Sequence, residues 1–242
     1  QRLLAKGANP EARAARGQTA LIWAASRKQP RVVALLLGAK ADVRARSESW
    51  SQMMAVPPHG YPGYNKLIPH GADTALLFAA RSGDLESAKL LVAAGADVND
   101  RDAWGVSAVA FAAHSGFTDL ALFLLDKGAD ASADAAGFAP LHIALMRRDQ
   151  RLIRVLIEHG ANAEAPLRTW TPTRRSSRDS HFAPQLVGVT PLWLAARFLQ
   201  PEAVRLLASK GANAKFVHRA EYVAEKGFKT RTESAGLVMA AL

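Results

Sequence analysis

Cysteine is absent from this chain of 242 residues. The sequence therefore excludes a disulfide framework, a thiolate zinc site and a cysteine nucleophile. It also lacks a run of about 18 uncharged apolar residues, which a membrane-spanning helix needs, and it begins with neither a methionine nor a signal peptide. We expect a chain with no membrane span that is a piece of a longer protein. These absences leave the compartment open.

Signatures of metal binding and catalysis are also missing. The chain has no H-E-x-x-H motif, and its glycines are spaced by repeat rather than gathered in a phosphate-binding loop. Ser177, Asp179 and His181 have the composition of a catalytic triad, but alternate residues on an extended chain lie roughly 6.6 Å apart, beyond hydrogen-bond reach. A triad needs its nucleophile bonded to its base. We expect a protein that is not an enzyme, with no catalytic residue, cofactor or metal.

Basic residues outnumber acidic ones at both ends of the chain, whereas acidic residues outnumber basic ones in its middle. Residues 1–50 carry ten Lys/Arg against three Asp/Glu, residues 51–165 carry nine against thirteen, and residues 166–242 carry twelve against five, within a net charge of +10. A basic total suggests nucleic acid or another polyanion, because phosphate neutralisation dominates such binding. The acidic centre argues against one continuous phosphate-binding stripe.

Two sequence markers alternate along the chain. The first is a Gly-Ala-Asp/Asn tripeptide after an apolar run, and the second is Gly-x-Thr-x-Leu-x-x-Ala-Ala, as in GVTPLWLAA. The first marker occurs at Gly7, Gly95, Gly128, Gly160 and Gly211, with a degraded copy at Lys40. The second begins at Gly17, Ala72, Gly105, Gly137 and Gly188.

These paired markers resemble the ankyrin repeat family, whose pattern G-x-T-P-L-H-x-A-A, a second helix and G-A-D-x-N recurs at about 33 residues. The match is best from Arg81 to Gly105. The resemblance implies an all-α solenoid of stacked antiparallel helix pairs with long inserted finger loops. We expect a single domain over residues 1–242, with a half-repeat over 1–16, repeats starting near 17, 72, 105, 137 and 188, and a partial repeat over 233–242.

The residues at these positions explain why such helices form. A hydroxyl can cap each first helix, and proline follows where a missing N–H does no harm. Small residues recur on one face of the first helices, and each second helix ends at a glycine suited to a left-handed cap. The hydroxyl residues are Thr19, Thr74, Ser107 and Thr190, and the prolines at the first helical position are Pro140 and Pro191.

Three inserts interrupt the regular spacing. From one Gly-Ala-Asp/Asn to the next first helix, ordinary units have ten residues, whereas the unit after Lys40 has 32 and the unit after Gly160 has 28. We therefore expect elongated finger loops over residues 47–69 and 166–187, and a third over 214–232 before a first helix near Glu233. Neither end of the chain has a polar cap, which suggests self-association or a place in a larger assembly.

The inserts contain residue types that are enriched at binding hot spots. The first is rich in aromatics, and the second combines aromatics with arginines. Two interpretations stay open for the tryptophans: they anchor a partner, or they fold back to cover the neighbouring repeats. The candidate residues in the inserts are Trp50, Tyr61, Tyr64, Trp170, Arg174, Arg175 and Arg178.

Further candidates come from the resemblance, which implies binding at the finger tips and the exposed side of the first helices. Trp104 and Phe138 are expected to form an exposed aromatic pair on successive fingers. The resemblance also gives His142 a structural hydrogen bond between loops. Trp23, Phe78, Phe111 and Trp193 are interpreted as packing residues. The other candidates at variable positions are Arg13, Arg16, Arg101, Arg147, Arg197 and Phe198.

We expect a non-enzymatic protein-interaction module that binds a partner, possibly through an acidic surface of that partner, on its concave face and enlarged fingers. No small-molecule substrate is evident. Binding of nucleic acid or another polyanion through the basic ends and fingers is one alternative. A structural subunit of a larger assembly is another. Long finger inserts resemble those of bacterial ankyrin repeat proteins, and this favours an extracytoplasmic location, periplasmic or secreted, over a cytoplasmic one.

Overall fold

The computed structural model describes residues 2–54, 62–171, 182–224 and 229–237, apart from the side chain of Tyr64. The chain divides into two compact units, each made of two segments. The first unit contains residues Gln1–Ser51 and Pro69–Asp130, and the second contains Gln52–Ile68 and Ala131–Leu242. The single domain expected over the whole chain stays a prediction. In the described ranges no helix is long and apolar enough to cross a membrane.

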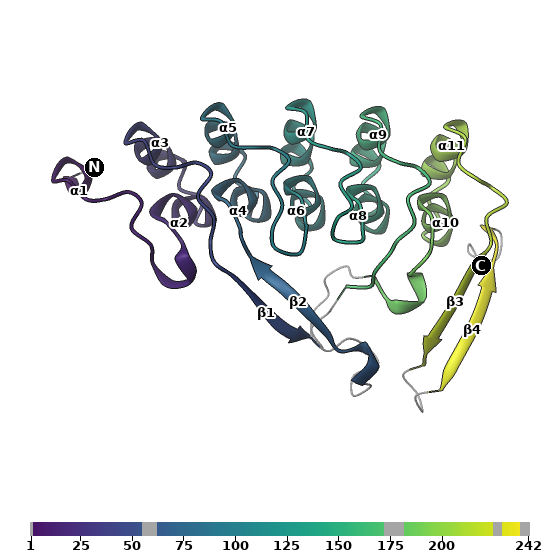
Figure 1. Cartoon of the computed structure of the whole chain (residues 1–242). Coiled ribbons are helices and arrows are strands. Elements are labelled where there is room, and N and C mark those ends of the chain that lie inside the picture. Colours follow the sequence, from purple (N-terminus) through teal and green to yellow (C-terminus); the bar gives the residue numbers. More distant parts are fainter. Residues whose placement is uncertain (1, 55–61, 172–181, 225–228, 238–242) are drawn as a thin grey trace. The chain divides into compact units, whose positions relative to one another are not determined.

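The first unit contains three helix pairs and a short leading helix. Within each pair the two helices contact one another, and the first helices of successive pairs also pack together, as do the second helices. Figure 1 shows α2, α4 and α6 in one row and α3, α5 and α7 in another. The helices are α1 (Arg2–Ala5), α2 (Ala20–Ser26), α3 (Pro30–Gly38), α4 (Ala75–Ser82), α5 (Leu85–Ala93), α6 (Ala108–Ser115) and α7 (Thr118–Asp126), with a 3-10 turn, η1 (Ala15–Gly17).

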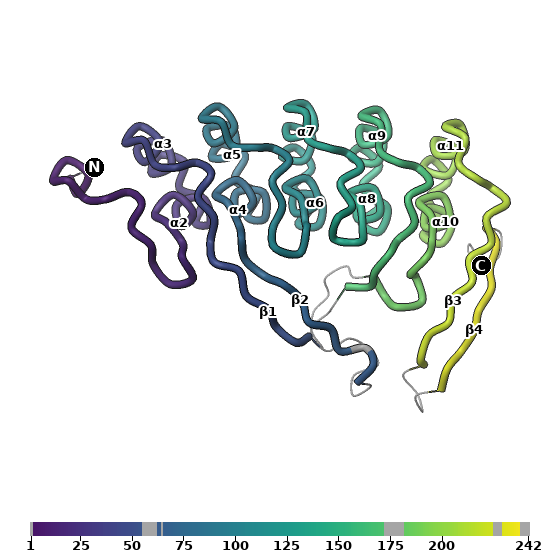
Figure 2. Tube along the Cα trace, in the orientation of Figure 1, coloured from purple at the N-terminus to yellow at the C-terminus, as the bar shows by residue number. Residues whose placement is uncertain are grey.

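The second unit contains two further helix pairs. The helices α8 and α10 contact one another, and so do α9 and α11. After α11 the trace runs out through β3 and returns through β4 (Figure 2). The elements are α8 (Pro140–Arg147), α9 (Gln150–Glu158), a 3-10 turn η3 (Pro184–Leu186), α10 (Pro191–Arg197), α11 (Pro201–Ser209), β3 (His218–Val223) and β4 (Thr230–Ala235).

Helix caps form where the second marker predicts them. The hydroxyls of Thr19, Thr74, Ser107 and Thr190 each accept a hydrogen bond from the backbone N–H three residues later. Pro140 and Pro191 occupy first-turn positions. These caps satisfy N–H groups that have no partner inside the helix, and the polar residues therefore fix where each first helix begins.

Alanine and leucine fill the core of each unit. The alanine pairs of the first helices are buried, among them Ala79 and Ala80 on α4 and Ala112 and Ala113 on α6. Small side chains at these positions allow neighbouring helices to approach closely, so the buried face of one pair is covered by the next. The glycines that follow the second helices have a positive φ, for example 93° at Gly95, as a left-handed cap requires.

The first insert is a β-hairpin, and the expectation of a loop over residues 47–69 is wrong in this respect. The strands β1 (Ser49–Met54) and β2 (Lys66–Gly71) pair with one another, and a 3-10 turn, η2 (Pro62–Tyr64), precedes β2. A long insert has many backbone N–H and C=O groups that need partners. Pairing two strands supplies those partners without help from the helices.

The third insert is also a hairpin, and this corrects the loop expected over 214–232 and the first helix expected near Glu233. The remainder of the partial repeat over 233–242 stays a prediction, because residues 238–242 lie outside the described residues. In β3 and β4, Glu233 lies in a strand opposite Ala220 instead of starting a helix. Alternate residues of β3 are buried, beginning with His218 and Ala220, as expected for a strand with one covered face. In the described residues two small antiparallel sheets therefore accompany the helices, so the protein is a helical repeat structure but not purely α-helical.

Candidate functional site

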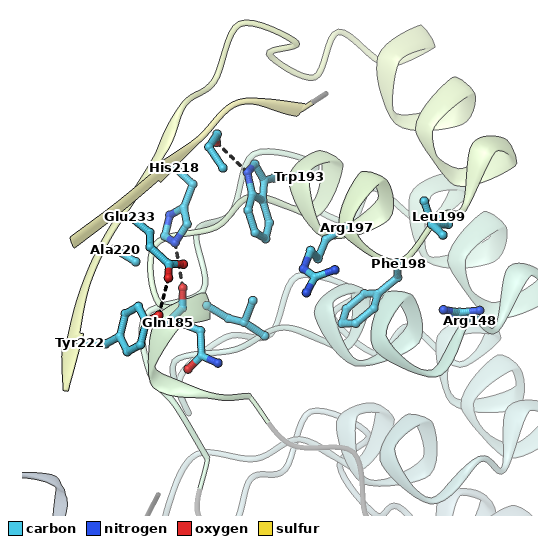
Figure 3. Close-up of a pocket in the computed structure, with 12 residues that line it drawn as sticks. Arg148, Gln185, Trp193, Arg197, Phe198, Leu199, His218, Ala220, Tyr222 and Glu233 are labelled. Atoms are coloured by element: carbon cyan, nitrogen blue, oxygen red, sulfur yellow. Dashed lines mark hydrogen bonds between the residues drawn. The ribbon is translucent and has the colours of Figure 1, made fainter. Parts of the chain in front are cut away.

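The hairpin β3–β4 is fixed to the first helix of the last helix pair. Trp193 of α10 donates a hydrogen bond from Nε1 to the carbonyl oxygen of Ala235 over 2.9 Å. Its indole meets the His218 ring edge-on, with 5.1 Å between centroids. Figure 3 shows these side chains between the helix and the strands. The bond and the ring contact hold both strands against α10.

His218 also connects the hairpin to the second insert. Its Nε2 lies 2.9 Å from the carbonyl oxygen of Gln185. A carbonyl oxygen only accepts, so Nε2 carries the proton in this contact. The ring of Phe216 stacks near that of His218, with centroids 6.5 Å apart. The two inserts therefore meet through one buried histidine.

A cavity of about 450 Å³ lies between the hairpin and the helices, and we call it the hairpin groove. Arg148, Arg197, Phe198 and Leu199 line it on the helix side, and Tyr222, Glu233 and Ala235 are among its lining residues on the strand side (Figure 3). Leu199 is 66% exposed, and both arginines are exposed. The groove therefore opens to solvent on the side of its apolar and cationic residues.

Among the described residues that line the groove, the single carboxylate is that of Glu233, and it is already engaged. The Tyr222 hydroxyl donates to Oε1 of Glu233 over 2.5 Å, and this hydrogen bond raises the pKa of Tyr222 above its ordinary value. In the described part of the chain, the side chains of Arg148 and Arg197 make neither a hydrogen bond nor an ion pair. The groove is therefore cationic, with two guanidinium groups available to a ligand.

A second surface lies on the first helices of the first unit, and we call it the aromatic row. Trp23, Phe78 and Phe111 each lie four residues after the capping hydroxyl of their helix. Trp23 is 40% exposed, and the two phenylalanines are half-buried. Because α2, α4 and α6 pack in succession, the three rings occupy one register of the repeat.

Arginines cover the rings of the aromatic row. The guanidinium carbon of Arg81 lies 4.2 Å from the ring centroid of Phe111 and 5.4 Å from that of Phe78. That of Arg27 lies 5.6 Å from the centroid of Trp23. Such cation–π contacts are favourable. Arg81 thus bridges the rings of Phe78 and Phe111, and Arg27 lies over that of Trp23.

A buried carboxylate positions Arg81. The carboxylate of Asp73 accepts a hydrogen bond from the Arg81 guanidinium over 3.0 Å. Burial raises the pKa of the Asp73 carboxyl, and the nearby charge of Arg81 opposes this rise. The backbone N–H of Asp73 donates to the Ser47 hydroxyl, also over 3.0 Å. The start of the first insert and the arginine above the aromatic row are therefore held by the same residue.

Two family models match the chain. The model described as "Ankyrin repeat" matches residues 16–48, and the one described as "Ankyrin repeats (3 copies)" matches residues 76–167 and 134–218. The chain belongs to the ankyrin repeat family. Ankyrin repeats are generally protein–protein interaction modules, and proteins of the family are generally non-enzymatic. In the described residues no group of three or more His, Asp or Glu could hold a metal ion.

Several predicted site residues support the ankyrin fingers themselves. Arg13 donates to the carbonyl oxygens of Gly17 and Arg46, over 3.1 and 2.9 Å. The guanidinium carbon of Arg16 lies 3.9 Å from the ring centroid of Trp50, and the half-buried indole stacks on His70. The structure therefore brings Arg16 and Trp50 together at the base of the first hairpin.

The expectation that Phe138 belongs to an exposed aromatic pair is wrong. Phe138 is 7% exposed, and its ring lies 5.6 Å from that of Phe182 in the second insert, which covers it. Trp104 is half-buried, and its backbone N–H donates to Asp102, whose carboxyl has a pKa raised by burial. Sequence register alone did not indicate that an insert folds over the finger of Phe138.

Trp170 lies against the first insert within the second unit. The Lys66 ammonium lies 5.0 Å from its ring centroid and donates to the Thr169 hydroxyl over 2.6 Å. Burial lowers the pKa of Lys66. The half-buried ring of Trp170 therefore packs against a residue of the first insert and is not freely exposed.

The remaining predicted residues have varied positions. Arg197 and Phe198 line the hairpin groove, Arg147 is exposed at the end of α8, and Arg101 lies 3.9 Å from the Asp130 carboxylate. Other candidates lie outside the described residues, and for Tyr64 only the backbone is described. Those wholly outside are Tyr61, Arg174, Arg175 and Arg178.

His142 forms the structural hydrogen bonds that the family resemblance implied. Its Nδ1 accepts from the backbone N–H of Ala139 over 3.0 Å, and its Nε2 lies 2.9 Å from the carbonyl oxygen of Ala165. The side chain is fully buried, and this burial lowers its pKa to about 4. It is therefore a neutral element of the fold rather than a ligand.

Sequence reasoning missed the strand side of the groove and the exposure of the aromatic row. The alternation of Phe216, His218, Ala220 and Tyr222, followed by Gly227, is a hairpin signal that could have located β3. Trp193 was interpreted as a packing residue, and it is buried, but its indole N–H also fixes the hairpin.

Proposed function

We propose that this ankyrin repeat chain binds a partner protein on the surface formed by its first helices and elongated fingers. The observation that supports the proposal is the aromatic row. Trp23, Phe78 and Phe111 recur at one repeat register, remain partly accessible, and carry arginines above their faces. Aromatic and arginine residues dominate binding hot spots. A partner lying along the row can therefore contact three successive repeats.

The charges of the row favour a protein over a polyanion. Asp73 already pairs with Arg81, so the charge of this arginine is partly neutralised. A partner would therefore mainly contact the flat face of the guanidinium group and the aromatic rings. Binding that depends on aromatic burial weakens only modestly with salt, whereas phosphate binding weakens steeply. The salt dependence of partner affinity therefore separates the proposal from the nucleic-acid alternative.

The test combines a pull-down with substitutions in the row. A partner recovered with the wild-type chain is measured against Trp23→Ala, Phe78→Ala and Phe111→Ala. The matched control is Phe123→Ala, because Phe123 is half-buried on the second helix α7 and also has a cation, Lys127, above its ring. We expect at least one row variant to bind about tenfold more weakly, as hot-spot truncations do.

The control separates binding from folding. Melting temperatures are recorded for all four variants, and a row variant counts only when it melts close to the control. If the row variants and Phe123→Ala bind the partner equally well, the row is not the binding surface. If the wild-type chain instead forms a stable oligomer on sizing and recovers no other protein, the assembly-subunit alternative is favoured.

A further inference from the structure

We propose that the hairpin groove is a second binding site, which takes a short extended acidic peptide of a partner protein. A carboxylate of the peptide pairs with Arg148 and Arg197, and an apolar side chain beside it lies against Phe198 and Leu199. The inference rests on the proposed function only in that the ligand is a protein. It concerns a different surface, on the second unit rather than on the aromatic row.

Charge complementarity supports this occupant. Arg148 and Arg197 line one cavity and are exposed, and their side chains make no ion pair or hydrogen bond in the described part of the chain. The carboxylate of Glu233, the only one among the described lining residues, accepts from Tyr222. Arginine is suited to carboxylates because its planar donors match the two carboxylate oxygens. An acidic group entering the groove therefore finds two unpaired partners.

The backbone gives a second, independent reason. In the first unit, Gly83 and Gly116 directly follow α4 and α6 with φ values of 76° and 78°, whereas Lys28 with φ 55° occupies the equivalent position after α2. At the equivalent positions after α8 and α10, the chain has Arg148 with φ 58° and Leu199 with φ 53°. Non-glycine residues are disfavoured there. Of the three non-glycine residues at this position, Arg148 and Leu199 line the groove, so the chain places a cation and an apolar side chain there despite the backbone strain.

The wall of the groove is fixed before a ligand arrives. The Trp193 hydrogen bond to Ala235 and the His218 contact with Gln185 hold β3 and β4 against α10 and the second insert. Preorganised walls reduce the ordering cost of binding. A hairpin held at both strands can therefore act as a binding surface.

The size of the groove favours an extended peptide. Its volume of about 450 Å³ falls within the range of pockets that take small ligands. A helix is about 10–12 Å across with its side chains and does not fit such a volume. Two or three residues of an extended chain do fit.

The test uses two fluorescein-labelled peptides that differ only in charge. In one, aspartate alternates with leucine, and in the other, asparagine replaces every aspartate. Fluorescence anisotropy with the whole chain should show binding of the aspartate peptide and much weaker binding of the asparagine peptide. We expect Arg197→Gln and Arg148→Gly each to weaken the aspartate peptide about tenfold or more, since each removes a charge-assisted contact.

Arg148→Gly also separates binding from folding. Glycine relieves the positive φ, so this variant should melt at or above the wild-type temperature while it loses peptide binding. The matched control is Lys28→Gly, because Lys28 lies at the equivalent position after α2 with φ 55° and is not in the groove. Lys28→Gly should bind the peptide as the wild-type chain does.

Several results would overturn the proposal. These are no binding of the aspartate peptide, equal binding of both peptides, or unchanged binding by both arginine variants. A concentration-dependent dimer that Arg148→Gly abolishes would instead assign the groove to a second copy of the chain. If the peptide fails but the aromatic-row variants weaken partner binding, only this inference fails. If the peptide binds but the row variants behave as wild type, only the proposed surface of the first helices fails.

Discussion

The indole Nε1 of Trp193 donates a hydrogen bond of 2.9 Å to the carbonyl oxygen of Ala235. This bond joins a helix of the repeat pattern to a strand that the pattern does not contain. Trp193 is 5% exposed, so water cannot readily reach its indole N–H and replace this hydrogen bond. The hairpin groove depends on this contact because one of its walls is the hairpin.

Replacing Trp193 with phenylalanine removes the donor while it keeps an aromatic ring. We expect the free energy of unfolding to fall by roughly 1–2 kcal/mol, because the partly buried carbonyl oxygen of Ala235 loses its hydrogen-bond donor. Hydrogen exchange should speed up in β3 and β4. Trp23→Phe is the control, since that ring is 40% exposed, and it should change stability little. Unchanged exchange in the hairpin of Trp193→Phe would contradict the role of this bond.

His142 makes stability depend on pH. Its pKa is about 4 in the folded chain, against an ordinary value of 6.5. Between these values the unfolded chain binds the proton and the folded chain does not, so stability falls as pH falls from about 6.5 to about 4. The contribution is fully present above this window and amounts to about 3 kcal/mol. Urea unfolding across the window measures it.

The comparison for His142 is the variant His142→Asn, which has no titrating ring. It should be less stable than the wild type at neutral pH, and its stability should change less across the window. His159→Gln serves as the matched control, because His159 is exposed, and its pH dependence should follow the wild type. Equal pH dependence of His142→Asn and the wild type would show that another group is responsible.

Two glycines separate backbone strain from crowding. Gly71 has φ 85°, and an added Cβ would lie 2.0 Å from the carbonyl oxygen of Glu48, whereas Gly95 has φ 93° and nothing within 4 Å. Gly95→Ala should cost roughly 1–2 kcal/mol for its conformation alone. Gly71→Ala should cost at least about 1 kcal/mol more, because the strand pair must move. Equal melting temperatures would contradict the packing at the base of β1–β2.

Trp170→Ala separates the two interpretations of this residue. The contact of the half-buried ring with Lys66 leads us to expect a loss of roughly 1–3 kcal/mol in stability, with partner binding intact. Calorimetry and the partner affinity are measured on the same preparation. Weakened binding at an unchanged melting temperature would instead identify Trp170 as a partner anchor.

The helix pairs could be predicted from the sequence because their determinants are local. The capping hydroxyls, the proline after the cap and the glycine after the second helix each fix a boundary within a few residues. Thr74 and Gly95 illustrate this, since both act where the repeat pattern places them. His142 could be placed for the same reason.

The inserts could not be predicted in the same way because their contacts are long-range. Glu233 follows a plausible helix pattern, but the chain places it in a strand because β3 supplies a partner for its backbone. Phe138 is buried by Phe182, which lies 44 residues later in the chain. The groove required both kinds of information: Arg197 and Phe198 come from a repeat helix, whereas Tyr222 and Glu233 come from the hairpin.

Site-specific photocrosslinking gives the most direct test of the proposed interaction surface. A photoreactive phenylalanine analogue replaces either Phe111 in the aromatic row or Phe123 on α7, both half-buried, and each chain is irradiated with the partner recovered by pull-down. The account predicts a crosslinked product from position 111 and little or none from position 123. A product from position 123 with none from position 111 would contradict it.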